Sequence, residues 1–547
     1  MIKQSLNRND IIELEIEDFT SEGSGVGHVN GQTVFVAGTA PGDTVKCIII
    51  KTKPNYAIGK MTEIIKASPD RQIPDCRVFP RCGGCAFRHI TYDAELKMKQ
   101  KRVSDAMHRI GHIELEVQNI VPSPDDRHYR NKAQYPLASE GGRLLTGFYA
   151  PFSHRVIECK TCLLQPQSFA AILRTVARWA EKYKVSVYDE RTGKGLLRHI
   201  YIRKAFATDE TMVCLVENGE KMFKTDVLVN ELIKADPSIK TVLININPAN
   251  TNVILGGKNK ILYGDGYITD ELLGKKFRIS PLSFYQVNRA QAEKLYTKAH
   301  EYASRGKTDV VLDLYCGAGT IGLTFADKVK KLIGVEIVPD AVKDAKVNAD
   351  LNGITNAEFI CSDASDAAKK LACENIKPDV IFLDPPRKGC DASLLNTVAL
   401  MNPDRIVYIS CDPATLARDC AVLENSGYKL IEYTPFDMFP RTAHVETVVQ
   451  LVRKKPDTVL DVRIDLSELD VTPAETEATY QEIKAYIFEQ HGVKVSSLYI
   501  AQVKEKHGLK ERENYNKAKS EDSKQPHCPA EKKKLIEEAL KHFQMID

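Results

Sequence analysis

Hydrophobic and polar residues alternate in short runs through the first part of the chain. Runs such as IIELEIEDF, TVFVAG and DTVKCIIIKT are separated by the turn sequences SEGSGVG and APGD. A period of two is typical of strands with one buried face, and turn residues between such runs favour hairpins. We therefore predict that residues 1–66 form a small β barrel.

Between residues 67 and 275 the pattern is mixed. A cysteine-dense stretch from Cys76 to Cys85 is followed by TYDAELKMKQKRVSDAMHRIG, which is basic and has helical spacing. Strand-like runs such as LLRHIYIRKA and KTVLININP then alternate with helical ones. This central domain is predicted to contain both helices and strands.

From residue 276 to 453, apolar strands and helical segments alternate regularly. The strand-like runs include VVLDL, KLIGVEIV, AEFIC, DVIFL, RIVYIS and HVETVVQLV. This alternation is typical of a parallel, doubly wound sheet with helices on both faces. The predicted fold class is therefore α/β, with a Rossmann-like domain that follows the barrel and the central domain.

Residues 454–547 are polar, charge-rich and helical in pattern. Thr472-Pro473-Ala474-Glu475 is a capping box with proline at the first helical position, and Tyr480, Ile483 and Ile487 then recur at helical spacing. SSLYIAQVKEKHG repeats the order of serine cap, short helix and His-Gly end. We predict a small helical extension that resembles a helix-turn-helix, a shape with many uses besides nucleic-acid binding.

Composition narrows the class of protein. The 547 residues are 43% hydrophobic and 27% charged, and the net charge of +3 creates no strong global field, so a nucleic-acid site would be a local patch. No apolar run approaches ~18 residues, and MIKQSLNRND lacks the apolar segment of a signal peptide. We expect a cytoplasmic monomer without membrane association, whose fourteen cysteines are thiols, metal ligands or catalysts rather than disulfides.

The strand VVLDL leads into a glycine-rich turn that contains Gly317, Gly319 and Gly322. Glycines permit a tight turn and close approach of a ligand, and the following helix offers backbone N–H groups. Glu336 ends the next strand, about where a carboxylate accepts hydrogen bonds from ribose hydroxyls. The arrangement predicts a nucleoside cofactor, and its spacing does not distinguish NAD from S-adenosylmethionine.

Two later strands end in residues suited to chemistry. Asp384 precedes two prolines and Arg387, which form a rigid loop at the edge where open α/β sheets bind ligands. The simpler interpretation is a capping aspartate in a turn. Such a loop suits a methyltransferase that acts on a planar base more than it suits an NAD enzyme. Cys411 follows RIVYIS, and is either a buried structural cysteine or a nucleophile presented at the strand end.

These motifs resemble those of the class I S-adenosylmethionine-dependent RNA (uracil-C5)-methyltransferases, a family that contains 23S rRNA enzymes and a tRNA relative. The matching motifs are SPLSFYQVN (280–288), LDLYCGAGTIGL, DPPRKG, SCDPATLARD and FPRTAHVETV (439–448). The first domain looks like the TRAM domain of that family, an OB-type RNA-binding module. The resemblance spans about residues 8–453 and implies methyl transfer to C5 of a uridine in 23S rRNA.

The resemblance also implies roles for individual residues. Cys411 is expected to be the nucleophile that adds to C6 of uracil, Glu446 the base that removes the C5 proton, and Asp384 the residue that holds the uracil edge. A thiolate is soft and able to depart, which suits this addition and release. Phe284 is a candidate for stacking on a base or for core packing. The expected cofactor contacts are Gln286, Tyr315, Gly317, Gly319, Glu336, Asp363 and Asp384.

Four cysteines match the iron–sulfur pattern of the family, and they are Cys76, Cys82, Cys85 and Cys162. Four thiolates bind either zinc or a [4Fe–4S] cluster, and the resemblance favours the cluster. Cys159 competes with Cys162 for the fourth position. Methyl transfer changes no oxidation state, so we expect the cluster to be structural or to position RNA.

Two alternative functions remain. A tRNA uracil-C5 methyltransferase would use the same chemistry, but the tRNA relative lacks both the barrel and the cluster. A non-catalytic iron–sulfur RNA-binding protein would not need Cys411, Glu446, Asp384 and Glu336 together. The barrel and the KMKQKR helix are expected to grip RNA phosphates, although a basic helix alone is usually a solvated face.

Overall fold

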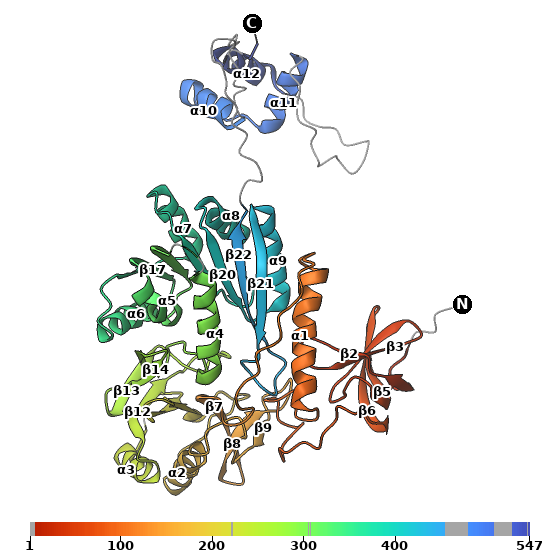
Figure 1. The fold of residues 1–547 in the computed structure, drawn as a ribbon, viewed down its shortest axis with the longest axis vertical. Coiled ribbons are helices and arrows are strands. Elements are labelled where there is room, and N and C mark those ends of the chain that lie inside the picture. The colour runs from red at the N-terminus through yellow and green to blue at the C-terminus, as the bar shows by residue number, and fades with distance from the viewer. Residues whose placement is uncertain are drawn as a thin grey trace. The chain divides into compact units, whose positions relative to one another are not determined.

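The computed structural model describes residues 6–219, 222–304, 306, 308–454, 480–507, 528–543 and 545–546. The chain divides into two compact units, residues 1–455 and 456–547 (Figure 1). The predicted capping box at residues 472–475 lies outside the described residues. Among the helices that are described, none has the length and apolar character needed to cross a membrane.

The N-terminal strands form one six-stranded sheet in the order β1-β5-β6-β4-β3-β2. The strands are β1 (Ile11–Glu15), β2 (Asp18–Phe19), β3 (Gly25–Val29), β4 (Gln32–Val36), β5 (Thr44–Thr52) and β6 (Tyr56–Lys66). The sheet is barrel-like, but no ladder pairs its edge strands β1 and β2 within the described residues, so the prediction of a small β barrel holds only in part. Glu17, between β1 and β2, donates its N–H to the Val26 carbonyl of β3 at 2.8 Å.

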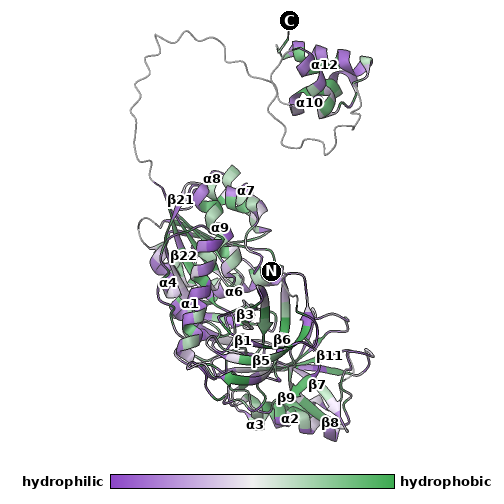
Figure 2. Ribbon diagram, turned by 90° about the vertical axis from the view of Figure 1, so that its right-hand side faces the viewer, coloured by the Kyte–Doolittle hydropathy of each residue, from purple (hydrophilic) through white to green (hydrophobic). Residues whose placement is uncertain are grey.

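Helix α1 (Tyr92–Arg109) is the predicted basic helix, and most of its surface is hydrophilic (Figure 2). Its apolar residues Val103 and Met107 pack into the same core as one face of the sheet formed by residues 310–453. Lys99, from the KMKQKR stretch, is buried and paired with carboxylates, and Arg102 donates to the Ala443 carbonyl at 2.8 Å. Lys99 and Arg102 of this helix therefore bind groups elsewhere in the protein. The prediction that the helix grips RNA phosphates did not include this structural role.

The central region is a mixed sheet in the order β13-β12-β11-β10-β7-β8-β9, with a separate β14-β15 hairpin. Its strands are β7 (Lys132–Glu140), β8 (Arg143–Tyr149), β9 (Val156–Glu158), β10 (Leu197–Lys204), β11 (Thr211–Glu217), β12 (Ile239–Ile246), β13 (Lys258–Tyr263), β14 (Ile268–Leu272) and β15 (Lys275–Ile279). Helices α2 (Phe169–Lys182) and α3 (Thr225–Ala235) share an apolar core with this sheet. The region contains helices and strands, as its pattern predicts.

The doubly wound sheet of residues 310–453 has seven strands in the order β18-β17-β16-β19-β20-β22-β21. They are β16 (Val310–Leu314), β17 (Lys331–Glu336), β18 (Ala357–Cys361), β19 (Val380–Leu383), β20 (Arg405–Ser410), β21 (Tyr428–Phe436) and β22 (Glu446–Arg453). Five neighbouring strands are parallel, as predicted. Strand β22 runs antiparallel to both of its neighbours, so the prediction of a fully parallel sheet is wrong for this strand.

Helices cover both faces of the doubly wound sheet, because each face is apolar and needs a partner. They are α4 (Arg289–Ala303), α5 (Thr320–Phe325), α6 (Pro339–Leu351), α7 (Ala364–Cys373), α8 (Ala392–Leu400) and α9 (Pro413–Asn425), with a short 3-10 helix at Ala326–Lys328. Helices α4, α5 and α6 belong to one core, and α7, α8 and α9 share the other with α1.

The second unit is helical, as its pattern predicts. It contains α10 (Tyr480–His491), α11 (Ser497–Lys506) and α12 (Ala530–His542). Ser496 caps α11 through its hydroxyl, which accepts from Tyr499 N–H at 3.3 Å. The buried side chains of its core are Ile483, Ile487, Val495, Ile500, Val503, Ile536, Ala539 and Leu540.

Candidate active site and cysteine cavity

The carboxyl ends of the parallel strands meet at one edge of the doubly wound sheet. Leu314 of β16 pairs with Leu383 of β19, and Leu383 pairs with Tyr408 of β20. The loops that begin at Tyr315 and Asp384 are therefore neighbours. Glu336 ends β17 and Asp363 follows β18, the strands on the other side of β16, so the predicted residues lie along one edge of the sheet.

The antiparallel strand β22 brings Glu446 to the same edge. Ser410 pairs with Thr447 in the ladder between β20 and β22. Cys411 and the buried Glu446 directly adjoin this pair, and Glu446 lies close enough to act on the Cys411 thiol. The sequence motif suggested both residues, but their juxtaposition depends on the reversed direction of β22.

Cys411 lies between the end of a strand and the start of a helix. Asp412 caps α9, because its Oδ1 accepts from the N–H groups of Ala414 and Thr415, both at 3.0 Å. Pro413 is the first residue of the helix. These two residues shape the turn that presents Cys411, and Cys411 remains half-buried.

Burial and neighbouring charges shift the pKa values of the titratable groups at this edge. Burial raises the pKa of Cys411 to about 11, and the nearby carboxylates of Glu446 and Asp384 act in the same direction. Burial also raises the pKa of Asp384 to about 7 and that of Glu446 well above its ordinary value. Arg387 opposes the shift in both Cys411 and Glu446. Sequence reasoning quoted Arg387 in a motif without giving it this electrostatic role.

The glycine turn borders open space. Gly317 and Gly319 have φ values of 56° and 81°, which L side chains rarely adopt, and a Cβ on Gly317 would meet no atom within 4 Å. Glu336 accepts from Gly317 N–H at 3.1 Å and from Val338 N–H at 2.9 Å. Its carboxylate is therefore held rigidly beside the turn. This is the place where a carboxylate that accepts hydrogen bonds from ribose hydroxyls is expected.

The remaining predicted cofactor residues differ in their surroundings. Asp363 caps α7 by accepting from Ser365 N–H at 2.8 Å. Gln286 is buried, and Tyr296 of α4 lies close to both Gln286 and Asp384. Tyr296 is a site residue that sequence reasoning missed, because its spacing matches ordinary helix packing. Phe284 is 62% exposed, so it does not belong to the core.

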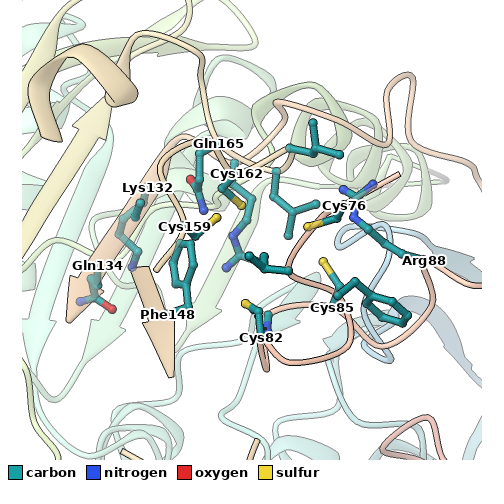
Figure 3. Close-up of a pocket in the computed structure, with 17 residues that line it drawn as sticks. Cys76, Cys82, Cys85, Arg88, Lys132, Gln134, Phe148, Cys159, Cys162 and Gln165 are labelled. Atoms are coloured by element: carbon teal, nitrogen blue, oxygen red, sulfur yellow. Dashed lines mark hydrogen bonds between the residues drawn. The ribbon is translucent and has the colours of Figure 1, made fainter. Parts of the chain in front are cut away.

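A second site is a cavity of about 270 Å³ in the central region (Figure 3). Its lining includes five cysteines, which are Cys76, Cys82, Cys85, Cys159 and Cys162. Three basic residues, Arg88, Arg130 and Lys132, also line it. The predicted ligands therefore share one cavity, and Cys159 shares it with them.

The cavity surrounds its thiols with positive charge. Burial raises the pKa of Cys85 to about 12, and the charge of Arg88 opposes this shift. A hydrogen bond from Cys159 lowers the pKa of Cys162. Arg88 Nη2 is buried without a hydrogen-bond partner among the described residues. Among all the residues that the structure describes, no three His, Cys, Asp or Glu side chains are placed to hold a metal ion.

Comparison with known proteins shows where this architecture occurs. A family model described as tRNA (Uracil-5-)-methyltransferase matches residues 91–454. The chain belongs to this methyltransferase family. A TRAM domain model matches residues 6–62, which confirms the expected identity of the N-terminal sheet.

Members of the methyltransferase family resemble the chain over most of their own length. An RNA methyltransferase of Halalkalibacterium halodurans is 44% identical over 450 residues, which are 82% of this chain and 98% of the relative. One from Clostridium tetani is 43% identical over 444 residues, or 81% and 96% of the two chains. The crystal structure of Pyrococcus abyssi tRNA (uracil-54, C5)-methyltransferase with S-adenosyl-L-homocysteine has a TM-score of 0.66, is 26% identical, and covers 81% of this chain and 100% of its own.

The predicted enzyme class, an S-adenosylmethionine-dependent RNA (uracil-C5)-methyltransferase, is confirmed by the family model and by these relatives. The match to the methyltransferase family ends at residue 454. The helical unit with α10, α11 and α12 therefore lies beyond the part of the chain that the family model matches.

Proposed function

We propose that this methyltransferase modifies C5 of a uridine in 23S rRNA. The observation that carries the proposal is that Cys411 and Glu446 both adjoin the Ser410–Thr447 pair, beside the loop of Asp384. The TRAM domain supports an RNA substrate, and the resemblance of the sequence motifs to those of 23S rRNA enzymes favours rRNA. tRNA is the second candidate, because the similar Pyrococcus enzyme acts on tRNA and its whole length aligns with this chain.

The first chemical step belongs to Cys411. Its thiolate adds to C6 of uracil, which turns C5 into an enolate-like carbon able to attack a methyl group. The buried thiol must lose its proton first, and the charge of Arg387 favours the thiolate. The target base has to leave its stack to reach the sulfur, or come from a single-stranded loop.

S-adenosylmethionine supplies an electrophilic methyl group when it is bound. The residues present fit it, because the glycine turn borders open space and Glu336 is held beside that turn. We propose that Gln286, Tyr315 and Asp363 complete its surroundings. Asp384 lies where it can hold the uracil edge, and its raised pKa of about 7 suits a carboxyl group that donates as well as accepts hydrogen bonds.

Glu446 completes the reaction. After methyl transfer, C5 carries both the new methyl group and its original proton. Glu446 accepts that proton, the C5–C6 double bond re-forms, and the C6–S bond breaks to release Cys411 as a thiolate. Burial favours the protonated form of Glu446, whereas Arg387 favours the carboxylate that this step requires.

We propose that Cys76, Cys82, Cys85 and Cys162 hold a [4Fe–4S] cluster. The cavity fits such a group, because its thiols are accompanied by Arg88, Arg130 and Lys132, whose charges would balance an anionic cluster. Four thiolates would also hold a zinc ion, and the metal content of the purified protein distinguishes the two. Methyl transfer needs no electron, so the cluster would be structural.

Protein prepared without oxygen is expected to contain about four iron atoms and four inorganic sulfides per chain. Cys82→Ser removes one thiol of the cavity and is expected to lose most of this iron together with the visible absorption. Cys373→Ser, at an exposed cysteine on α7, is the matched control. Stoichiometric zinc, or unchanged iron in Cys82→Ser, would contradict the cluster assignment.

The substrate proposal predicts which RNA carries the product. In cells that lack the enzyme, one or more 5-methyluridines should disappear from 23S rRNA and return with the wild-type gene, as mass mapping of rRNA and tRNA fragments would show. Purified enzyme should restore them in unmodified rRNA. Loss of 5-methyluridine from tRNA alone would establish the tRNA candidate instead.

A further inference from the structure

Glu446 stands at the base of a hairpin. Strands β21 and β22 are joined by residues 437–445, and Phe436 pairs with Glu446 where the hairpin closes. The loop turns tightly, since the Thr442 hydroxyl donates to the Phe439 carbonyl at 2.8 Å. Because Glu446 is the first residue after this loop, the position of the loop decides where the carboxylate lies.

Helix α1 holds the start of the loop through a buried ion network. Lys99 Nζ donates to Asp437 Oδ1 at 2.6 Å and to Glu95 Oε1 at 2.7 Å. The Tyr92 hydroxyl donates to the other carboxylate oxygen of Asp437 at 2.7 Å. The side chains of Lys99, Glu95 and Asp437 are almost completely buried, so their partners fix them in one arrangement.

Arg441 holds the middle of the loop. Its guanidinium donates to Asp126 through Nε at 2.7 Å and to the Ile90 carbonyl through Nη1 at 3.1 Å. Its backbone N–H donates to Glu95 at 2.7 Å. The residue is buried, and its φ of 68° is rare for a side chain of this size.

The backbone carbonyl of Arg441 faces the cysteine-rich segment. It accepts from Ala86 N–H at 2.8 Å and from Phe87 N–H at 3.1 Å, and these residues directly follow Cys85. One residue therefore contacts α1, the segment after the cysteines, and the loop that ends at Glu446.

We propose that Arg441 is a positioning residue whose guanidinium ties the loop 437–445, and with it Glu446, to Asp126 and to the Ile90 carbonyl just before α1. The inference rests on the proposed role of Glu446 as the base. Cys411 is carried by β20 and α9, outside this loop, so its addition to C6 does not depend on Arg441. Removal of the guanidinium therefore slows proton removal more than it slows adduct formation.

Arg441→Gly is the most informative variant, because glycine adopts a positive φ freely and keeps the backbone hydrogen bonds. Turnover is expected to fall about 100-fold, and a methylated RNA–protein adduct should accumulate. KM for RNA should stay within about twofold. Arg441→Lys keeps a positive charge near Asp126 and should restore most of the turnover. Arg453→Ala removes an exposed arginine at the far end of β22 and is the control.

The outcomes separate this inference from the function on which it rests. Suppose that Glu446→Gln accumulates adduct. The positioning role of Arg441 is then overturned if Arg441→Gly turns over normally, or if it turns over slowly without accumulating adduct. Absence of adduct in Glu446→Gln means that the assignment of the base itself is wrong. If Arg441→Gly does not fold, Asp126→Asn replaces it, since this change weakens the same tie. Adduct accumulation in Asp126→Asn supports the inference, and wild-type kinetics overturn it.

Discussion

Replacing Cys411 with alanine is expected to abolish methyl transfer while RNA and cofactor still bind. Without the thiolate, C5 of uracil is too weak a nucleophile to attack a methyl group, so the rate should fall on the order of 10⁴-fold or more. Incorporation of labelled methyl groups into RNA measures the rate, and filter binding and calorimetry measure the two affinities.

The fold should tolerate this change. Cys411 is half-buried and lies in a turn whose geometry comes from Asp412 and Pro413. Cys373→Ser, at an exposed cysteine far along the chain from the motif, controls for the general loss of a thiol. Substantial methylation by Cys411→Ala would contradict covalent catalysis. Loss of RNA binding together with activity would assign the cysteine a structural role.

The position of most candidate residues follows from local sequence patterns. Tyr315, Asp384 and Cys411 each come directly after a short apolar strand. Because parallel strands end at a common edge, the order of strands and helices suffices to predict that these residues lie together. The glycine turn is equally local, since its positive φ values depend on the glycines themselves.

Other features depend on contacts that no local pattern carries. Lys99 looks like one basic residue among several on a surface helix, yet it is buried against Asp437, 338 residues away. The direction of β22, which brings Glu446 to the active edge, is likewise set by its pairing with β20 and β21. Whether the N-terminal sheet closes into a barrel likewise depends on whether its two edge strands pair, which no local pattern determines.

Replacing Glu446 with glutamine is expected to trap the reaction after methyl transfer. Glutamine has nearly the shape of the protonated acid but cannot accept the C5 proton, so the adduct between Cys411 and C6 cannot eliminate. Loss of a general base costs typically 10²–10⁴-fold in rate, and turnover should fall by about this amount. RNA labelled in its backbone and a labelled methyl group should migrate together with the protein on a denaturing gel.

The controls for this experiment distinguish a base from a charge that merely shapes the site. Cys411→Ala combined with Glu446→Gln should form no adduct, because the sulfur is absent. Glu358→Gln removes an exposed carboxylate, paired with Lys331 on the edge of the same sheet, and should behave like the wild type. Normal turnover of Glu446→Gln would assign proton removal to another group. Slow turnover with only free RNA would mean that Glu446 acts before the covalent bond forms, and would contradict its assignment as the base that removes the C5 proton.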